Sequence, residues 1–171
     1  HNHSDTEILR SLSRGEMPQL CEYESHAMEE VSFALDLLEA RGDIDPDSPE
    51  AEAIVLDQLK DVVTHEVGHT LGFTHNFRAS TAYTLDQLEN TEFTKLNGLT
   101  GSTMDYNAIN IAPKGKKQGQ YAMTTIGPYD FWAVEYAYKP LDPATEKADL
   151  LAIAARSKEP LLAFANDLDA G

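Results

Sequence analysis

One eleven-residue string constrains this chain more than any other feature. Residues 65–75 read H-E-V-G-H-T-L-G-F-T-H, which is the pattern H-E-x-x-H-x-x-G-x-x-H. With the chain's own frequencies of histidine, glutamate and glycine, a shuffled sequence would contain this pattern roughly once in 30,000 trials. Chance is therefore a poor explanation, and the string is expected to fix the local structure and the chemistry around it.

The residues before the string predict a helix. Ser48 followed by Pro49 is a start signal, because serine is a good N-cap and proline suits the first helical position. Val55, Leu59 and Val62 then recur at helical spacing and predict the core-facing stripe, with His65 at its edge. Polar groups on such a stripe are costly unless they are paired or bound to a ligand.

The spacing of the string matches the geometry of a metal site. His65 and His69 are four residues apart, so a helix presents both imidazoles on one side. Gly72 is expected to take the left-handed conformation that ends a helix, which brings His75 back from another direction. Three neutral imidazoles with an open fourth position are typical of a catalytic zinc site. Glu66 is then placed to act as general base for a water in that position.

Two further strings extend the pattern. Residues 102–106 read S-T-M-D-Y, and residues 127–135 read G-P-Y-D-F-W-A-V-E. With the histidine string they resemble the metzincin metalloproteases, and more closely the large bacterial zinc-dependent metalloproteases with a Met-zincin catalytic domain. The resemblance implies that Met104 is the methionine of the turn beneath the zinc ligands. It also implies that Tyr106 stabilises the oxyanion and that Asp130, near the start of a helix, braces the turn.

The expected fold is mainly α, as a single metalloprotease catalytic domain over residues 1–171. It would comprise an N-terminal helical part (1–47), a part from the zinc helix to the helix after the Met-turn (48–139), and a C-terminal helix and tail (140–171). Metzincins place a sheet before the zinc helix, but the first 64 residues show helical periodicity and almost no strand pattern. We therefore expect that sheet to be truncated or reduced, in a fragment of a longer protein whose other domains would be partners.

Charge limits the classes of partner. With 13 Lys and Arg against 29 Asp and Glu, the formal net charge is −16, which disfavours nucleic acid and anionic membrane surfaces. The chain has no apolar run long enough to span a bilayer. Its one cysteine, Cys21, is expected to be a buried free thiol. A role for Cys21 as a latency ligand is not favoured, because nothing around it forms a recognisable pro-segment.

The sequence thus predicts a zinc endopeptidase that acts on peptides or proteins, with an extracytoplasmic location implied by the family resemblance. Two alternatives remain open. One is a gluzincin-type aminopeptidase, in which a downstream acid such as Glu89 or Glu92 replaces His75 as the third ligand. The other is a non-catalytic interaction fragment that retains a zinc site.

Overall fold

The computed structural model describes residues 21–167 and 169, and the regular secondary structure in this part of the chain is entirely helical. None of these residues forms a strand, which confirms the mainly α prediction. The α-helices are α2 (Tyr23–Arg41), α3 (Pro49–Thr70), α4 (Leu85–Leu88), α5 (Thr91–Asn97), α6 (Pro128–Tyr138) and α7 (Glu146–Ala155). Three single 3-10 turns accompany them: η1 (Ala79–Thr81), η2 (Arg156–Lys158) and η3 (Pro160–Leu162).

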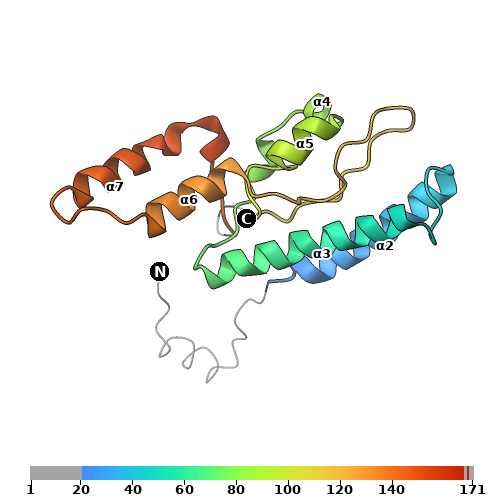
Figure 1. Ribbon diagram of the computed structural model, residues 1–171, viewed down its shortest axis with the longest axis horizontal. Helices are drawn as coiled ribbons and strands as arrows, with labels where there is room; N and C mark the ends of the chain where they lie inside the picture. Colours follow the sequence, from blue (N-terminus) through green and yellow to red (C-terminus); the bar gives the residue numbers. More distant parts are fainter. Residues whose placement is uncertain (1–20, 168, 170–171) are drawn as a thin grey trace, which may run out of the picture.

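Helices α2 and α3 pack as an antiparallel pair, and α6 and α7 extend beyond the C-terminal end of α3 (Figure 1). Gly42 ends α2 with a φ of 71°, a left-handed conformation that glycine adopts without steric cost. Ser48 caps α3, where its hydroxyl accepts a hydrogen bond from the Ala51 amide at 3.2 Å. The start of α3 lies where the sequence predicted it. Val31 and Leu38 of α2 pack with Ile54 of α3 as the centre of the apolar core.

The buried face of α3 differs from the prediction. Val55 and Leu59, which were expected to face the core, are 43% and 56% exposed. The buried positions form the adjacent stripe, which is largely polar: Ala51, Ile54, Gln58, Asp61, His65 and Gly68. Apolar periodicity selected the wrong face because two of the buried polar groups, Asp61 and His65, have hydrogen-bond partners that lie far away in the sequence. Asp61, for instance, accepts hydrogen bonds from Asn107 and from the Met123 amide.

The rest of the chain covers one side and one end of the helix pair. The segment between α5 and α6 runs without regular structure beside α3, and α6 and α7 form a second helical pair (Figure 1). The indole nitrogen of Trp132 joins this pair by donating to the Ile153 carbonyl at 2.7 Å. Across the described residues, no helix has both the length and the apolar character needed to cross a membrane.

Candidate metal centre

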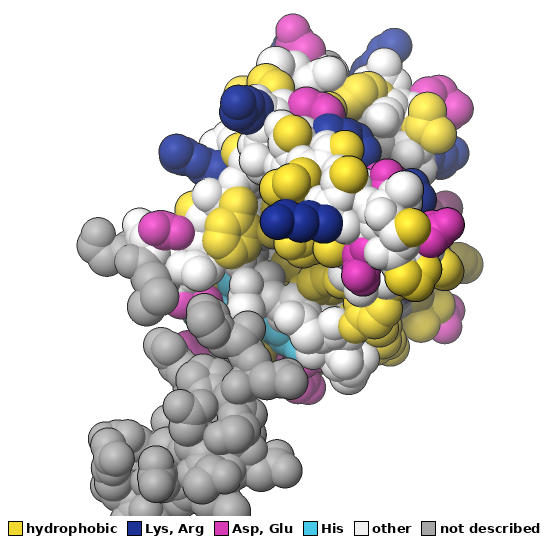
Figure 2. Space-filling model, turned by 90° about the vertical axis from the view of Figure 1, so that its left-hand side faces the viewer, with side chains coloured by type: hydrophobic (Ala, Val, Ile, Leu, Met, Phe, Trp, Pro, Cys, Tyr) yellow, Lys and Arg dark blue, Asp and Glu magenta, His cyan; other side chains and the backbone are white. Residues whose placement is uncertain are grey.

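Three histidine rings meet at the C-terminal end of α3. His65 and His69 project from α3 with their ring centroids 4.7 Å apart. The helix ends at Thr70, and Gly72 turns the chain with a φ of 86°. The turn brings the ring of His75 to 5.4 Å from that of His65 and to 4.9 Å from that of His69. The helix–glycine–return geometry expected from the sequence is therefore present, and histidine side chains reach the surface on this face (Figure 2).

Each of these imidazoles is oriented by an acceptor at its Nδ1 atom. The His65 Nδ1 lies 2.8 Å from the carbonyl oxygen of Thr103, and the His69 Nδ1 lies 3.0 Å from that of Phe73. The His75 Nδ1 lies 3.0 Å from a carboxylate oxygen of Asp167. Because carbonyl and carboxylate oxygens only accept, each Nδ1 carries the hydrogen and each Nε2 keeps a free lone pair. This outer arrangement is the one that metal-binding histidines commonly show.

The Nε2 atoms of this cluster fit a metal ion. Within the described chain, the Nε2 atoms of His69 and His75 are buried and have no hydrogen-bond partner. Such orphaned acceptors are costly unless a ligand satisfies them. Burial lowers the pKa of His65 to about 4, so its ring is in the neutral form that binds metals.

Cys21 belongs to the same cluster. Its Sγ lies 3.4 Å from the His65 Nε2, and one donor atom from each of Cys21 and the three histidines lies within 4.8 Å of the others. Cys21 is a free thiol, as expected, but it is half-buried and not fully buried, and it lies just before α2, beside the end of α3. Burial raises the pKa of this thiol, and the neighbouring Glu66 carboxylate raises it further.

Tyr106 lies on the open side of the cluster. Its ring centroid is 4.9 Å from that of His75, and its hydroxyl lies 3.6 Å from the Cys21 Sγ. Burial raises the pKa of Tyr106 to about 12, so the phenol keeps its proton at neutral pH and can donate a hydrogen bond. The exposed Glu66 follows His65 on α3.

The segment with Met104 lies directly beneath the end of α3. Met104 is 1% exposed, and a Cβ added to Gly68 would come within 2.2 Å of its sulfur. Asp130 holds this segment from the first turn of α6, where its carboxylate accepts hydrogen bonds from the Ser102 hydroxyl and the Thr103 amide. The same Thr103 offers its carbonyl to His65, so the aspartate and the first histidine are joined through one residue.

A model of the Met-zincin family matches residues 47–171, which is most of the chain and includes all three histidines. The chain belongs to the Met-zincin family. Comparisons with curated proteins and with solved structures found no match.

In this Met-zincin chain, the acid that orients His75 comes from a distant part of the sequence. Asp167 lies 92 residues beyond His75. The preceding tail is fixed by Asn76, whose side chain bonds the Ala163 carbonyl and the Ala165 amide. No motif in the sequence pointed to Asp167, and the apolar residues 161–165 before it contact Asn76 without forming a strand.

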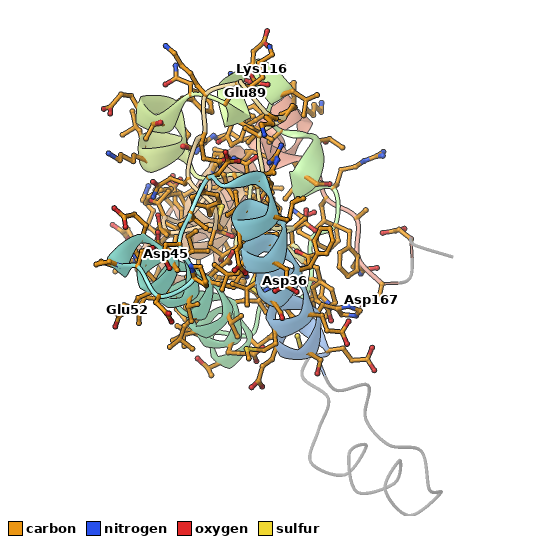
Figure 3. The ribbon with its side chains drawn as sticks, turned by 90° about the vertical axis from the view of Figure 1, so that its right-hand side faces the viewer. Asp36, Asp45, Glu52, Glu89, Lys116 and Asp167 are labelled. Atoms are coloured by element: carbon orange, nitrogen blue, oxygen red, sulfur yellow. The ribbon has the colours of Figure 1, made fainter. Side chains whose placement is uncertain are left out.

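The acids of the gluzincin alternative lie away from the cluster. Glu89 pairs with Lys116 at 3.6 Å, and Figure 3 shows these two residues together and well separated from Asp167. Glu92 pairs with Lys95 at 3.9 Å on α5. Neither glutamate is among the four residues whose donor atoms converge, whereas His75 is.

Proposed function

We propose that this Met-zincin chain is a zinc-dependent peptidase that hydrolyses peptide bonds in peptide or protein substrates. The observation that carries the proposal is the convergence of the three Nε2 atoms, each made available by an acceptor at the opposite ring nitrogen. Family membership supports the same chemistry.

His65, His69 and His75 would hold the ion. An all-imidazole set suits zinc, and three such ligands leave a coordination position for a reactant. When bound, zinc lowers the pKa of water towards 7 and polarises the carbonyl of the scissile bond.

Glu66 and Tyr106 would act on the reactants. In this proposal Glu66, next to His65 on α3, takes a proton from the attacking water and passes it to the leaving amine. The protonated Tyr106 hydroxyl donates to the oxygen on which negative charge develops. Both groups are neighbours of the Cys21 thiol, which in turn lies beside the His65 imidazole.

Met104 and Asp130 would position the ligands without binding the ion. Met104 fills the space under Gly68 and so supports the last turns of α3. Asp130 fixes residues 102–103, and Thr103 in turn fixes the imidazole of His65. These are positioning roles, because neither side chain reaches the reacting atoms.

The test combines zinc content with peptide cleavage. One zinc per chain is expected after addition of zinc, with loss of that zinc in His75→Ala. Digestion of a peptide library is measured for the chain and, because Cys21 lies at the site, also for Cys21→Ala. Glu66→Gln in each background should reduce cleavage by about 10²-fold or more while zinc remains bound.

Three outcomes would count against the proposal. Full zinc retention in His75→Ala would favour the gluzincin ligand set. Cleavage that survives Glu66→Gln would remove Glu66 as the base. Bound zinc without cleavage in either background would favour the non-catalytic alternative.

A further inference from the structure

We propose that Cys21 is a fourth metal ligand of this chain and that it closes the site against water and substrate until it is displaced. The inference rests on the proposed zinc site and adds a state of that site in which hydrolysis cannot begin. It follows from where the chain places the thiol, from the groups around it and from the contacts that hold it.

The distance between the Cys21 sulfur and the His65 Nε2 matches that between two ligands of one zinc ion. In a tetrahedral zinc site, with bonds of about 2.0–2.1 Å to nitrogen and about 2.3 Å to sulfur, an edge between sulfur and nitrogen measures about 3.6 Å. The Cys21 Sγ lies 3.4 Å from the His65 Nε2, and all four donor atoms lie within 4.8 Å of one another. One thiolate and three imidazoles complete the four-ligand set that is typical of closed zinc sites.

The thiol also occupies the space that hydrolysis needs. Besides His65, its polar neighbours include the Tyr106 hydroxyl at 3.6 Å and the Glu66 carboxylate. These are the groups that the proposed reaction assigns to the oxyanion and to the attacking water. Sulfur bound to the ion would take the coordination position that the attacking water needs.

Adjacent residues fix Cys21 in this place. The Glu22 amide donates to the Tyr106 hydroxyl at 3.1 Å. Tyr23 is 1% exposed, its ring lies 4.6 Å from that of His65, and its hydroxyl donates to the Asn107 carbonyl. The two residues after Cys21 are therefore anchored to the site, which holds the Cys21 backbone close to the histidines.

The exchange balances without a redox partner. When Cys21 binds, its thiol gives a proton to solvent and its sulfur takes the place of a water. When Cys21 leaves, the sulfur regains a proton and water returns.

Thiol labelling gives a readout that does not depend on activity. Cys21 is the only cysteine in the sequence, so iodoacetamide reports on this residue alone. Zinc should slow alkylation by about tenfold or more relative to the chelator-treated chain, because a bound thiolate is withdrawn from reaction. His75→Ala, which weakens the metal site but keeps the cysteine, should lose this protection.

Cobalt substitution tests the bond itself. The Co²⁺-loaded chain should show a thiolate-to-cobalt charge-transfer band in the near ultraviolet, and Cys21→Ser should lose the band while retaining cobalt. Acetohydroxamate, a small chelating probe of the open position, should bind Cys21→Ala at least about tenfold more tightly than the unaltered chain, because it need not displace sulfur.

These experiments distinguish failure of the Cys21 role from failure of the proposed zinc site. If one metal ion binds but the thiol is labelled at the metal-free rate and the charge-transfer band is absent, the role of Cys21 is refuted and the three-histidine site stands. If neither the chain nor Cys21→Ala takes up metal, the proposed function fails, and this inference fails with it.

Discussion

Replacement of Asp167 by alanine should weaken zinc binding about tenfold. The carboxylate accepts from the His75 Nδ1 through both oxygens, at 3.0 and 3.1 Å. Loss of such an outer partner commonly lowers metal affinity 10- to 100-fold, because the imidazole loses orientation and basicity. The Asp167 side chain is 46% exposed, so water replaces part of the lost interaction and the effect should fall at the lower end. Tenfold corresponds to about 1.4 kcal/mol of binding free energy.

The assay is a competition titration of zinc against a chromophoric chelator, with circular dichroism to check folding. Asp167→Asn keeps an acceptor for the Nδ1 hydrogen but loses the charge, so its affinity should fall between those of the unaltered chain and Asp167→Ala. Glu92→Ala is the matched control, since it removes one negative charge from an exposed ion pair on α5 and should leave affinity unchanged.

Two results would refute the reasoning. Zinc affinity of Asp167→Ala within twofold of the unaltered chain would mean that the carboxylate does not support His75. An equal loss in Glu92→Ala would mean that zinc responds to the net charge of the chain and not to a specific contact.

Three further predictions concern the framework under the site. Asp130→Ala leaves three buried donors without an acceptor, so it should lower the free energy of unfolding, measured in urea, by about 3 kcal/mol or more. Asp130→Asn keeps an acceptor and should lower it less. Equal losses in the two variants would contradict the acceptor role. Burial raises the pKa of Asp61 to about 7, so its contribution to stability is complete below the unfolded value of 3.8 and is lost as pH rises through 7. The destabilisation by Asp61→Asn in the metal-free chain should therefore shrink by about 2 kcal/mol between pH 5 and pH 7, and a pH-independent difference would oppose this. Gly68→Ala should destabilise by about 1–2 kcal/mol in urea despite the better helix propensity of alanine, because the new methyl group meets the Met104 sulfur; the exposed Val67→Ala is the control and should be nearly neutral.

Local rules account for the ends of several helices. The Ser48 cap, the turn at Gly42 and the start of α6 at Pro128 all follow from contacts within a few residues of the chain. The short helix α4 likewise begins with a local signal, the reciprocal capping box of Thr84 and Gln87. Such features need no tertiary partner, so sequence patterns suffice for them.

The same rules failed for the buried face of α3. Apolar periodicity placed Val55 and Leu59 inside, but the buried stripe carries Gln58, Asp61 and His65. A polar side chain can be buried when another segment supplies its hydrogen bonds, and for Asp61 and His65 those segments lie far away in the sequence. For Asp61 they are residues 107 and 123.

The sequence by itself determined the three histidines and their relative placement, because the helical repeat and one left-handed glycine act over only eleven residues. Only the tertiary structure decided what surrounds them. Cys21 reaches His65 across 44 positions and Asp167 reaches His75 across 92. No periodicity connects residues so far apart, and their contacts depend on how α2 and the C-terminal tail pack against the end of α3. The donor atoms are therefore encoded locally, whereas the fourth ligand proposed here and the acid behind His75 are products of packing.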